Sequence, residues 1–227
     1  MVASLFKYLP SQYLDAFVGR GELLFRSLSY FRNYEELEVR GDPQEGQRLY
    51  NPLNGLEINN LTSSESINFP WSFESSVQAR EIFVFCFSLE YLVSLSHEFD
   101  TDVCVEIHNP AALLAKVRAA LMLRRWVKNA KLLHGTLNYY SPSEPPLAEW
   151  AVPERMVLKK TENFAGQREY RFAFARGNAL QLNNVVTQIT ATPGVSQPTL
   201  IGHPEHVLRI GNLAKLCTIH TLNGRHH

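Results

Sequence analysis

The stretch Gln167-Arg168-Glu169-Tyr170-Arg171-Phe172-Ala173-Phe174 decides how the chain must fold around it. Successive side chains of a β-strand point to opposite faces, so the three aromatic residues share one face while Glu169, Arg171 and Ala173 share the other. The aromatic face is typical of a protein core. The opposite face carries an acid and a base beside a small residue, which leaves space next to the charges. This stretch therefore predicts a strand with one core face and one face open to chemistry.

Other segments predict several more strands and few helices. The run from Ile82 to Phe87 is unbroken, apolar and rich in β-branched and aromatic residues, which is typical of a central strand covered on both faces. Asn109-Pro110 opens the longest predicted helix, which extends to about Leu133, because proline is favoured in a first helical turn. Further short strands are expected at Leu5 to Leu9, Leu23 to Ser27, Val103 to Ile107 and Gly135 to Tyr140. We predict an α+β fold with a mixed or mainly antiparallel sheet and few helices.

The length of 227 residues fits a single domain over residues 1–227. One internal segment stands apart in composition. Residues 51–79 are polar and rich in asparagine and serine, with prolines at positions 52 and 70. This segment is expected to be an irregular insertion or a small hairpin, with Leu56 to Ile58 as one of its two strands.

Charge and cysteine content exclude some classes of protein. Lys+Arg and Asp+Glu both number 22, and this balance argues against a protein that coats nucleic acid through bulk charge. The three cysteines are far apart and lack metal-ligand spacing, so structural zinc is not expected and a reducing, cytoplasmic compartment is favoured. No apolar run of about 18 residues occurs, so no membrane-spanning helix is predicted.

Several short motifs occur in an order that resembles a known family. They are Lys7-Tyr8, the segment from Gly21 to Ser27, the segment from Leu28 to Asn33, Cys86-Phe87-Ser88, and Glu169-Tyr170-Arg171. Together they resemble a family of bacterial proteins, many of which are known only as a domain of unknown function. The resemblance spans roughly residues 5 to 175, and the order of the motifs carries it more than any one of them.

The layout is also similar to the ADP-ribosyltransferase superfamily, notably its DNA-modifying toxin branch. The superfamily places a Gln-x-Glu pair at a strand, here Gln167 and Glu169. The resemblance implies an enzyme, an NAD-dependent transferase, in which Glu169 stabilises the departing ribosyl cation and Gln167 positions the acceptor. That acceptor would be a nucleic acid or a protein, in the setting of a toxin or of phage defence.

The same resemblance implies residues that hold NAD. Where the superfamily has His or Arg on its first strand, this chain has Lys7 and Tyr8, and a lysine contacts phosphate as a point charge. Ser27 and Ser88 are expected to hydrogen-bond the ribose or amide groups of NAD. From the residue types, Tyr30 is expected to stack on nicotinamide or on a nucleobase, and Arg40 or Arg26 to clamp the pyrophosphate. No metal is expected in this reading.

Other interpretations of the same residues stay open. Glu169 and Arg171 are also compatible with a solvated ion pair at the edge of a strand. Asp42 and Glu45, joined by Glu169, are compatible with a metal-dependent nuclease or other phosphodiesterase. A non-catalytic binding or inhibitor protein would dock a partner through the aromatic loop from Ser29 to Arg40.

Geometry separates these hypotheses. The NAD hypothesis requires Glu169, Lys7 and Ser27 to line one cleft. The metal hypothesis requires Asp42 and Glu45 to lie within about 5 Å of Glu169, since oxygen–metal distances are about 2.0 to 2.6 Å. Burial of Glu169 against Arg171, away from Lys7, would count against both enzyme hypotheses.

Overall fold

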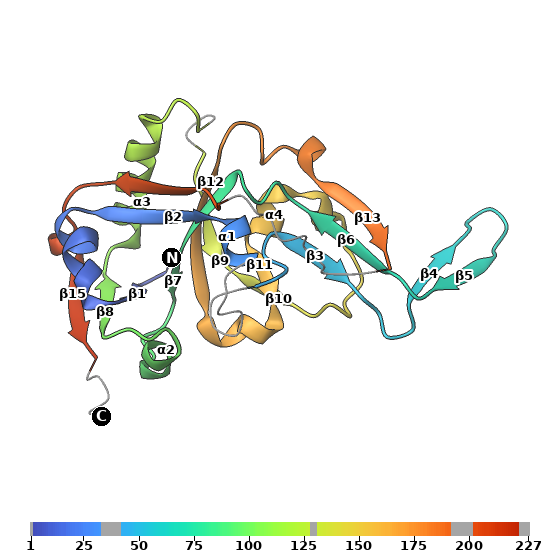
Figure 1. Ribbon diagram of the computed structural model, residues 1–227, viewed down its shortest axis with the longest axis horizontal. Coiled ribbons are helices and arrows are strands. Elements are labelled where there is room, and N and C mark those ends of the chain that lie inside the picture. Colours follow the sequence, from blue (N-terminus) through green and yellow to red (C-terminus); the bar gives the residue numbers. More distant parts are fainter. Residues whose placement is uncertain (1, 33–41, 128–130, 192–201, 223–227) are drawn as a thin grey trace.

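The computed structural model describes residues 2–32, 42–127, 131–191 and 202–222 (Figure 1). Its centre is an eight-stranded sheet in which every pairing is antiparallel. The main path of the sheet runs β14-β2-β7-β1-β8-β15, and β12 and β9 continue from the other edge of β7. The strands are β1 (Leu5–Leu9), β2 (Glu22–Ser27), β7 (Ile82–Ser88), β8 (Val103–Ile107), β9 (Leu133–Thr136), β12 (Glu169–Ala175), β14 (Glu205–Arg209) and β15 (Cys217–Thr221).

Strand β7 is the centre of this sheet. Along its whole length it pairs with β12, from Ile82 opposite Ala175 to Ser88 opposite Glu169. Its other edge pairs first with β2 and then, at Ser88, with β1. The unbroken apolar run predicted this central position, because such runs are typical of strands with both faces covered. Almost every residue of β7 is indeed buried.

The two faces of the central sheet carry different cores. Tyr170, Phe172 and Phe174 of β12 join a large aromatic core with residues of β2, β7 and the helix α3 (Pro110–Met122). Ala173 and Ala175 face the other way, into a smaller core that includes Leu28 and Met156. The predicted alternation of β12 is therefore confirmed, and both faces are buried rather than one.

Smaller sheets extend from this body to one side (Figure 1). Strands β13 (Val186–Thr190), β6 (Ser72–Ser76) and β3 (Gln47–Tyr50) form a three-stranded antiparallel sheet. Strands β4 (Leu56–Asn59) and β5 (Ser66–Phe69) form a hairpin that projects from the body, and it includes the strand predicted at Leu56 to Ile58. Strands β10 (Asn138–Tyr140) and β11 (Lys159–Thr161) pair in parallel.

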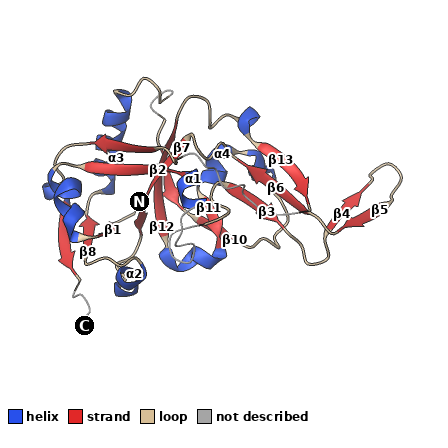
Figure 2. Ribbon diagram, viewed as in Figure 1, coloured by secondary structure: helices blue, strands red, loops and turns tan. Residues whose placement is uncertain are grey.

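Helices are few and mostly short (Figure 2). The α-helices of the described residues are α1 (Leu28–Arg32), α2 (Val93–Glu98), α3 and α4 (Pro153–Val157). The Asn109 side chain caps α3 by accepting a hydrogen bond from the Ala112 amide, as the Asn-Pro pair predicted. The predicted end near Leu133 is wrong: α3 ends at Met122, where the apolar periodicity stops at the exposed pair Met122 and Leu123, which are 75% and 80% exposed.

The fold is thus α+β, mostly antiparallel and poor in helices, as predicted from the sequence. Among the described residues, no helix is long and apolar enough to cross a membrane. The likeness to an ADP-ribosyltransferase layout remains a prediction.

Candidate functional site

A chain of alternating charges crosses the face of the central sheet that carries Glu169. Lys160, from β11, donates to Oε1 of Glu169 at 2.6 Å and to Oε1 of Gln167 at 3.0 Å. Gln167 in turn donates to Glu98, at the end of α2, at 3.0 Å. These residues come from three separate parts of the chain, and Lys160, Gln167 and Glu169 are buried.

Gln167 and Glu169 lie on the same side even though the strand does not include both. Gln167 ends a 3₁₀ turn, and β12 begins at Glu169. Arg168 between them has the positive φ of 44°, a left-handed conformation that reverses the chain locally. The two side chains therefore lie on the same side, and both accept a hydrogen bond from Nζ of Lys160, through a turn rather than through strand alternation.

Arg171 extends this network on the other side of Glu169. Its guanidinium forms a bidentate pair with Glu45, at 2.6 and 3.2 Å, and reaches Oε2 of Glu169 at 3.3 Å. It also donates to the carbonyl of Val157 at 2.8 Å. The side chains of Arg171 and Glu45 are each only 1% exposed. Two carboxylates thus share one buried arginine.

Burial and charge shift the pKa values of this network in opposite directions. Burial alone would raise the pKa of Glu169, but the positive charges of Lys160 and Arg171 outweigh it and lower that pKa to about 2. Burial would lower the pKa of Lys160, and the carboxylates of Glu169 and Glu45 raise it instead. Glu169 is therefore ionised at neutral pH, and its charge is compensated by Lys160 and Arg171.

Asp42 is the member of this region whose charge is poorly satisfied. It is 1% exposed, and one oxygen accepts a hydrogen bond from the Gln44 amide at 2.9 Å. Its Oδ2 has no hydrogen-bond partner among the residues that the structure describes. Burial and the nearby Glu45 carboxylate raise the pKa of Asp42 to about 6.

Of the predicted cofactor-binding residues, Ser88 lies with Glu169. The two are directly opposite in the register of β7 and β12, and the Ser88 hydroxyl donates to the carbonyl of Gln167 at 3.1 Å. Tyr8 is on the same face of the sheet, since it lies two residues after Phe6, which is opposite Ser88 in the register of β1 and β7. Its hydroxyl is occupied by the backbone of Leu92, from which it accepts a hydrogen bond at 2.6 Å.

Lys7 and Ser27 do not join the site. Lys7 alternates with Phe6 and so points to the opposite, aromatic face, where its Nζ lies 4.3 Å from the centroid of Phe85. Ser27 pairs with Phe83, a residue of that same aromatic core, and is completely buried. The expectation that these residues line one cleft with Glu169 is therefore wrong, because the sheet separates them.

Tyr30 lies apart from Glu169 as well, and Arg40 lies outside the described residues. The Tyr30 ring packs under the guanidinium of Arg26 at 4.1 Å and edge-on to His203 at 6.2 Å. It is thus part of a small cluster on β2, α1 and the segment before β14.

The structure also corrects the two alternative interpretations of the acidic residues, namely a solvated Glu169–Arg171 ion pair and a metal site. Glu169 and Arg171 do form an ion pair, but it is buried rather than solvated. Arg171 stands between Glu45 and Glu169, where the metal hypothesis requires a cation. In the described part of the chain, no group of three or more His, Cys, Asp or Glu side chains is arranged to hold a metal ion. Glu45 and Glu169 bind the protein's own cations, Arg171 and Lys160.

The projecting hairpin, which we call the arm (residues 51–71), carries several exposed apolar side chains. Ile58 and Ile67 are opposite each other in the register, so they share one face with the pair formed by Leu56 and Phe69. Ile58 is 44% exposed and Ile67 57% exposed. The opposite face carries only polar side chains, which are Glu57, Asn59, Ser66 and Asn68.

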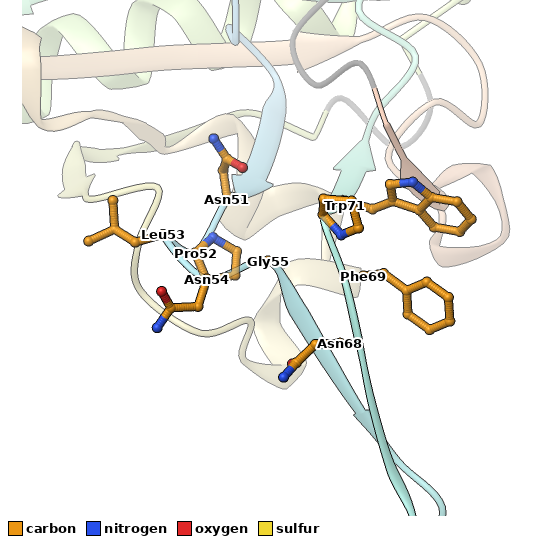
Figure 3. A pocket seen from close by; sticks show the side chains of 9 residues that line it. Asn51, Pro52, Leu53, Asn54, Gly55, Asn68, Phe69 and Trp71 are labelled. Atoms are coloured by element: carbon orange, nitrogen blue, oxygen red, sulfur yellow. The ribbon is translucent and has the colours of Figure 1, made fainter.

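The root of the arm is hollowed (Figure 3). Residues from Asn51 to Gly55 and from Asn68 to Trp71 line a hollow of about 440 Å³. Phe69 and Trp71 stack there with their ring centroids 5.1 Å apart, and Leu53, on the other side of the hollow, is fully exposed. The sequence held a signal for this surface: apolar and polar residues alternate in both Leu56–Asn59 and Ser66–Phe69.

No protein-family model, curated protein or solved structure matches this chain. The resemblances stated from the motifs therefore stay predictions, and function is argued from the geometry alone.

Proposed function

We propose that the chain is a non-catalytic binding protein whose arm docks into a protein partner. One observation carries this proposal: the arm is an amphipathic β-ribbon with an exposed apolar face. A two-stranded hairpin by itself is at best marginally stable in water, and its alternating pattern is typical of a ribbon with one face covered. The surface that would cover Ile58 and Ile67 is supplied by the partner.

Charge defines the kind of partner. Between Asn51 and Ser72 the chain contains Glu57 and Glu65 but neither lysine nor arginine. Two copies of the arm would both carry this net negative charge, and like charges disfavour self-association. The partner is therefore a different protein, with an apolar groove and basic residues at its rim. This binding surface differs from the loop between Ser29 and Arg40 that the sequence suggested.

The test compares two double variants of the arm. Ile58→Thr with Ile67→Thr changes the apolar face, and Asn59→Thr with Asn68→Thr changes the polar face by the same residue type. Proteins captured from the source cells by the wild-type chain are purified and titrated against all three forms. We expect the apolar-face variant to bind at least about tenfold more weakly, because central apolar contacts dominate interfaces. Equal binding by both variants would contradict the proposal.

A second candidate function is glycosyl transfer from NAD. The observation that favours it is the convergence of Gln167 and Glu169 on Lys160, with Ser88 beside them. Against it stands the compensated charge of Glu169, which has less to offer a developing ribosyl cation. In this candidate Glu169 is the catalytic carboxylate, Gln167 positions the acceptor, and Lys7 and Ser27 have no part.

NAD titration of the purified chain tests this candidate, with nicotinamide release measured alongside. It predicts saturable NAD binding and a release that disappears in Glu169→Gln and falls in Gln167→Ala. Circular dichroism of both variants establishes that they are folded, since Glu169→Gln also removes a buried ion pair. Absence of NAD binding by the folded wild-type chain would remove the candidate.

A further inference from the structure

A second surface lies at the other end of the molecule from the arm, on β1, β8 and β15 (Figure 1). Phe6 and Glu106 are opposite each other in the register of β1 and β8, so both point to the same face of the sheet. The ring of Tyr91 lies 6.1 Å from that of Phe6 and 5.0 Å from that of His220. We call the group formed by Phe6, Tyr91, Glu106, His108 and His220 the aromatic ledge.

The carboxylate of Glu106 lies at the centre of this ledge. Its Oε2 is 3.0 Å from Nε2 of His220, and its Oε1 is 3.6 Å from Nδ1 of His108. The His220 contact is within hydrogen-bond distance and holds the Glu106 carboxylate in one orientation, while the His108 contact is longer than a hydrogen bond. The Glu106 side chain is 22% exposed, so a ligand can reach it.

No lysine or arginine within the described ranges pairs with Glu106. The neighbouring acid, Glu90, is different, because Arg168 already binds it at 2.5 Å. In the described part of the chain, the ledge thus combines a carboxylate that pairs with no lysine or arginine and the side chain of Tyr91, a residue that is 40% exposed. A negative charge beside an aromatic ring is complementary to a flat cation.

We propose that the aromatic ledge binds the guanidinium group of an arginine residue on a partner protein. A guanidinium is planar, so it stacks on a tyrosine ring while its N–H groups reach a carboxylate at the edge. The protein uses this stacking internally: Arg26 lies 4.1 Å from the Tyr30 ring centroid and Arg48 lies 3.8 Å from that of Tyr140. This site is separate from the arm and does not depend on the function proposed for it.

The test uses a matched pair of small probes, N-acetyl-arginine methylamide and its citrulline counterpart. The two have nearly the same shape, and only the first carries a charge. Each is titrated into the full chain at about pH 8 and followed by NMR. We expect the arginine probe alone to shift resonances of the ledge. The dissociation constant should rise about threefold to fivefold in Tyr91→Ala and again in Glu106→Gln.

Tyr13→Ala serves as the control, because Tyr13 is 56% exposed and belongs to the 3₁₀ turn after β1 rather than to the ledge. It should bind the arginine probe like the wild type. Tyr91→Phe, which keeps the ring, should retain most of the binding and so separates stacking from any loss of fold. Equal binding of the citrulline probe, unchanged affinity in Tyr91→Ala, or no saturable binding of the arginine probe would each overturn the proposal.

Discussion

Arg171 balances two buried carboxylates, and the stability of the protein should depend on it. Arg171→Met leaves Glu45 and Glu169 without their shared cation. Removing one partner of a buried ion pair typically costs about 3–5 kcal/mol, so we expect a loss of that size in the free energy of unfolding, measured with urea.

A matched surface pair provides the control for that measurement. Arg176 pairs with Glu81 at 3.6 Å, and both side chains are well exposed. Arg176→Met should therefore change the free energy of unfolding by less than about 1 kcal/mol. Similar effects of the two substitutions would mean that the buried network does not stabilise the fold.

Asp42 should make stability depend on pH in the direction opposite to most carboxylates. Its pKa rises from 3.8 to about 6 on folding, so between these values the folded state binds more protons than the unfolded state. Stability contributed by this group is thus present at low pH and lost as pH rises through about 6, at a cost of up to about 3 kcal/mol.

Asp42→Asn tests this expectation, because it removes the ionisation. Urea unfolding should show the variant more stable than the wild type at about pH 7 and nearly equal to it at about pH 4. Glu169, whose pKa falls to about 2, loses its contribution in acid in both proteins alike, so it does not affect the comparison. A difference that is the same at both pH values would contradict the assignment to Asp42.

At the scale of elements, the turn before β2 depends on one glycine. Gly21 has a φ of +64°, and a Cβ built there would lie 2.0 Å from the carbonyl oxygen of Gly211. Gly21→Ala therefore adds a backbone clash to the strain of a left-handed conformation, and we expect it to destabilise the protein by more than about 2 kcal/mol in thermal unfolding.

Substitution of Gly177 separates the conformational strain from the backbone clash. It has a similar φ of +57°, but nothing lies within 4 Å of a Cβ built there. Gly177→Ala should cost only the conformational strain, about 1 to 2 kcal/mol. If the two substitutions cost the same, the close approach of Gly21 to Gly211 is not what constrains that turn.

The elements of the body were largely predictable because their signals are local. Val103–Ile107 and Leu5–Leu9 are strands with the predicted limits, and β7 extends the predicted run by one residue to Ser88. The charged network was not predictable in the same way. Arg171 meets Glu45 across 126 positions of sequence, and no periodic pattern links the two. Lys7 and Glu169 lie on opposite faces of the sheet because of the register in which β1 and β12 pair with β7. The sequence alone does not determine that register.

At the scale of the whole molecule, burial should protect the thiols. Burial raises the pKa values of Cys86 and Cys104 to about 12, and the thiolate is the reactive form. Cys86 and Cys217 are both partly buried, but the nearby Glu169 carboxylate further disfavours the Cys86 thiolate. In the native protein at about pH 8 we therefore expect iodoacetamide to label Cys217 first and to leave the other two unmodified for as long as the fold persists.

Mass spectrometry after labelling measures this directly. In concentrated urea all three cysteines should react at similar rates, which provides the reference. Rapid labelling of Cys86 in the native state would show that the face of the sheet carrying Glu169 opens to solvent on the time scale of the reaction.

The arm joins the body at a single point. The Ser72 hydroxyl donates to the Asn51 side chain at 2.7 Å, so the two ends of the arm lie next to each other. Because its ends are adjacent, the arm is an insertion that a short turn can replace, and the strands of the body then keep their positions. The length and the side chains of the arm can therefore change to suit new partners while the body of the protein stays the same. For the same reason, another peptide can be grafted in place of the arm without redesign of the body.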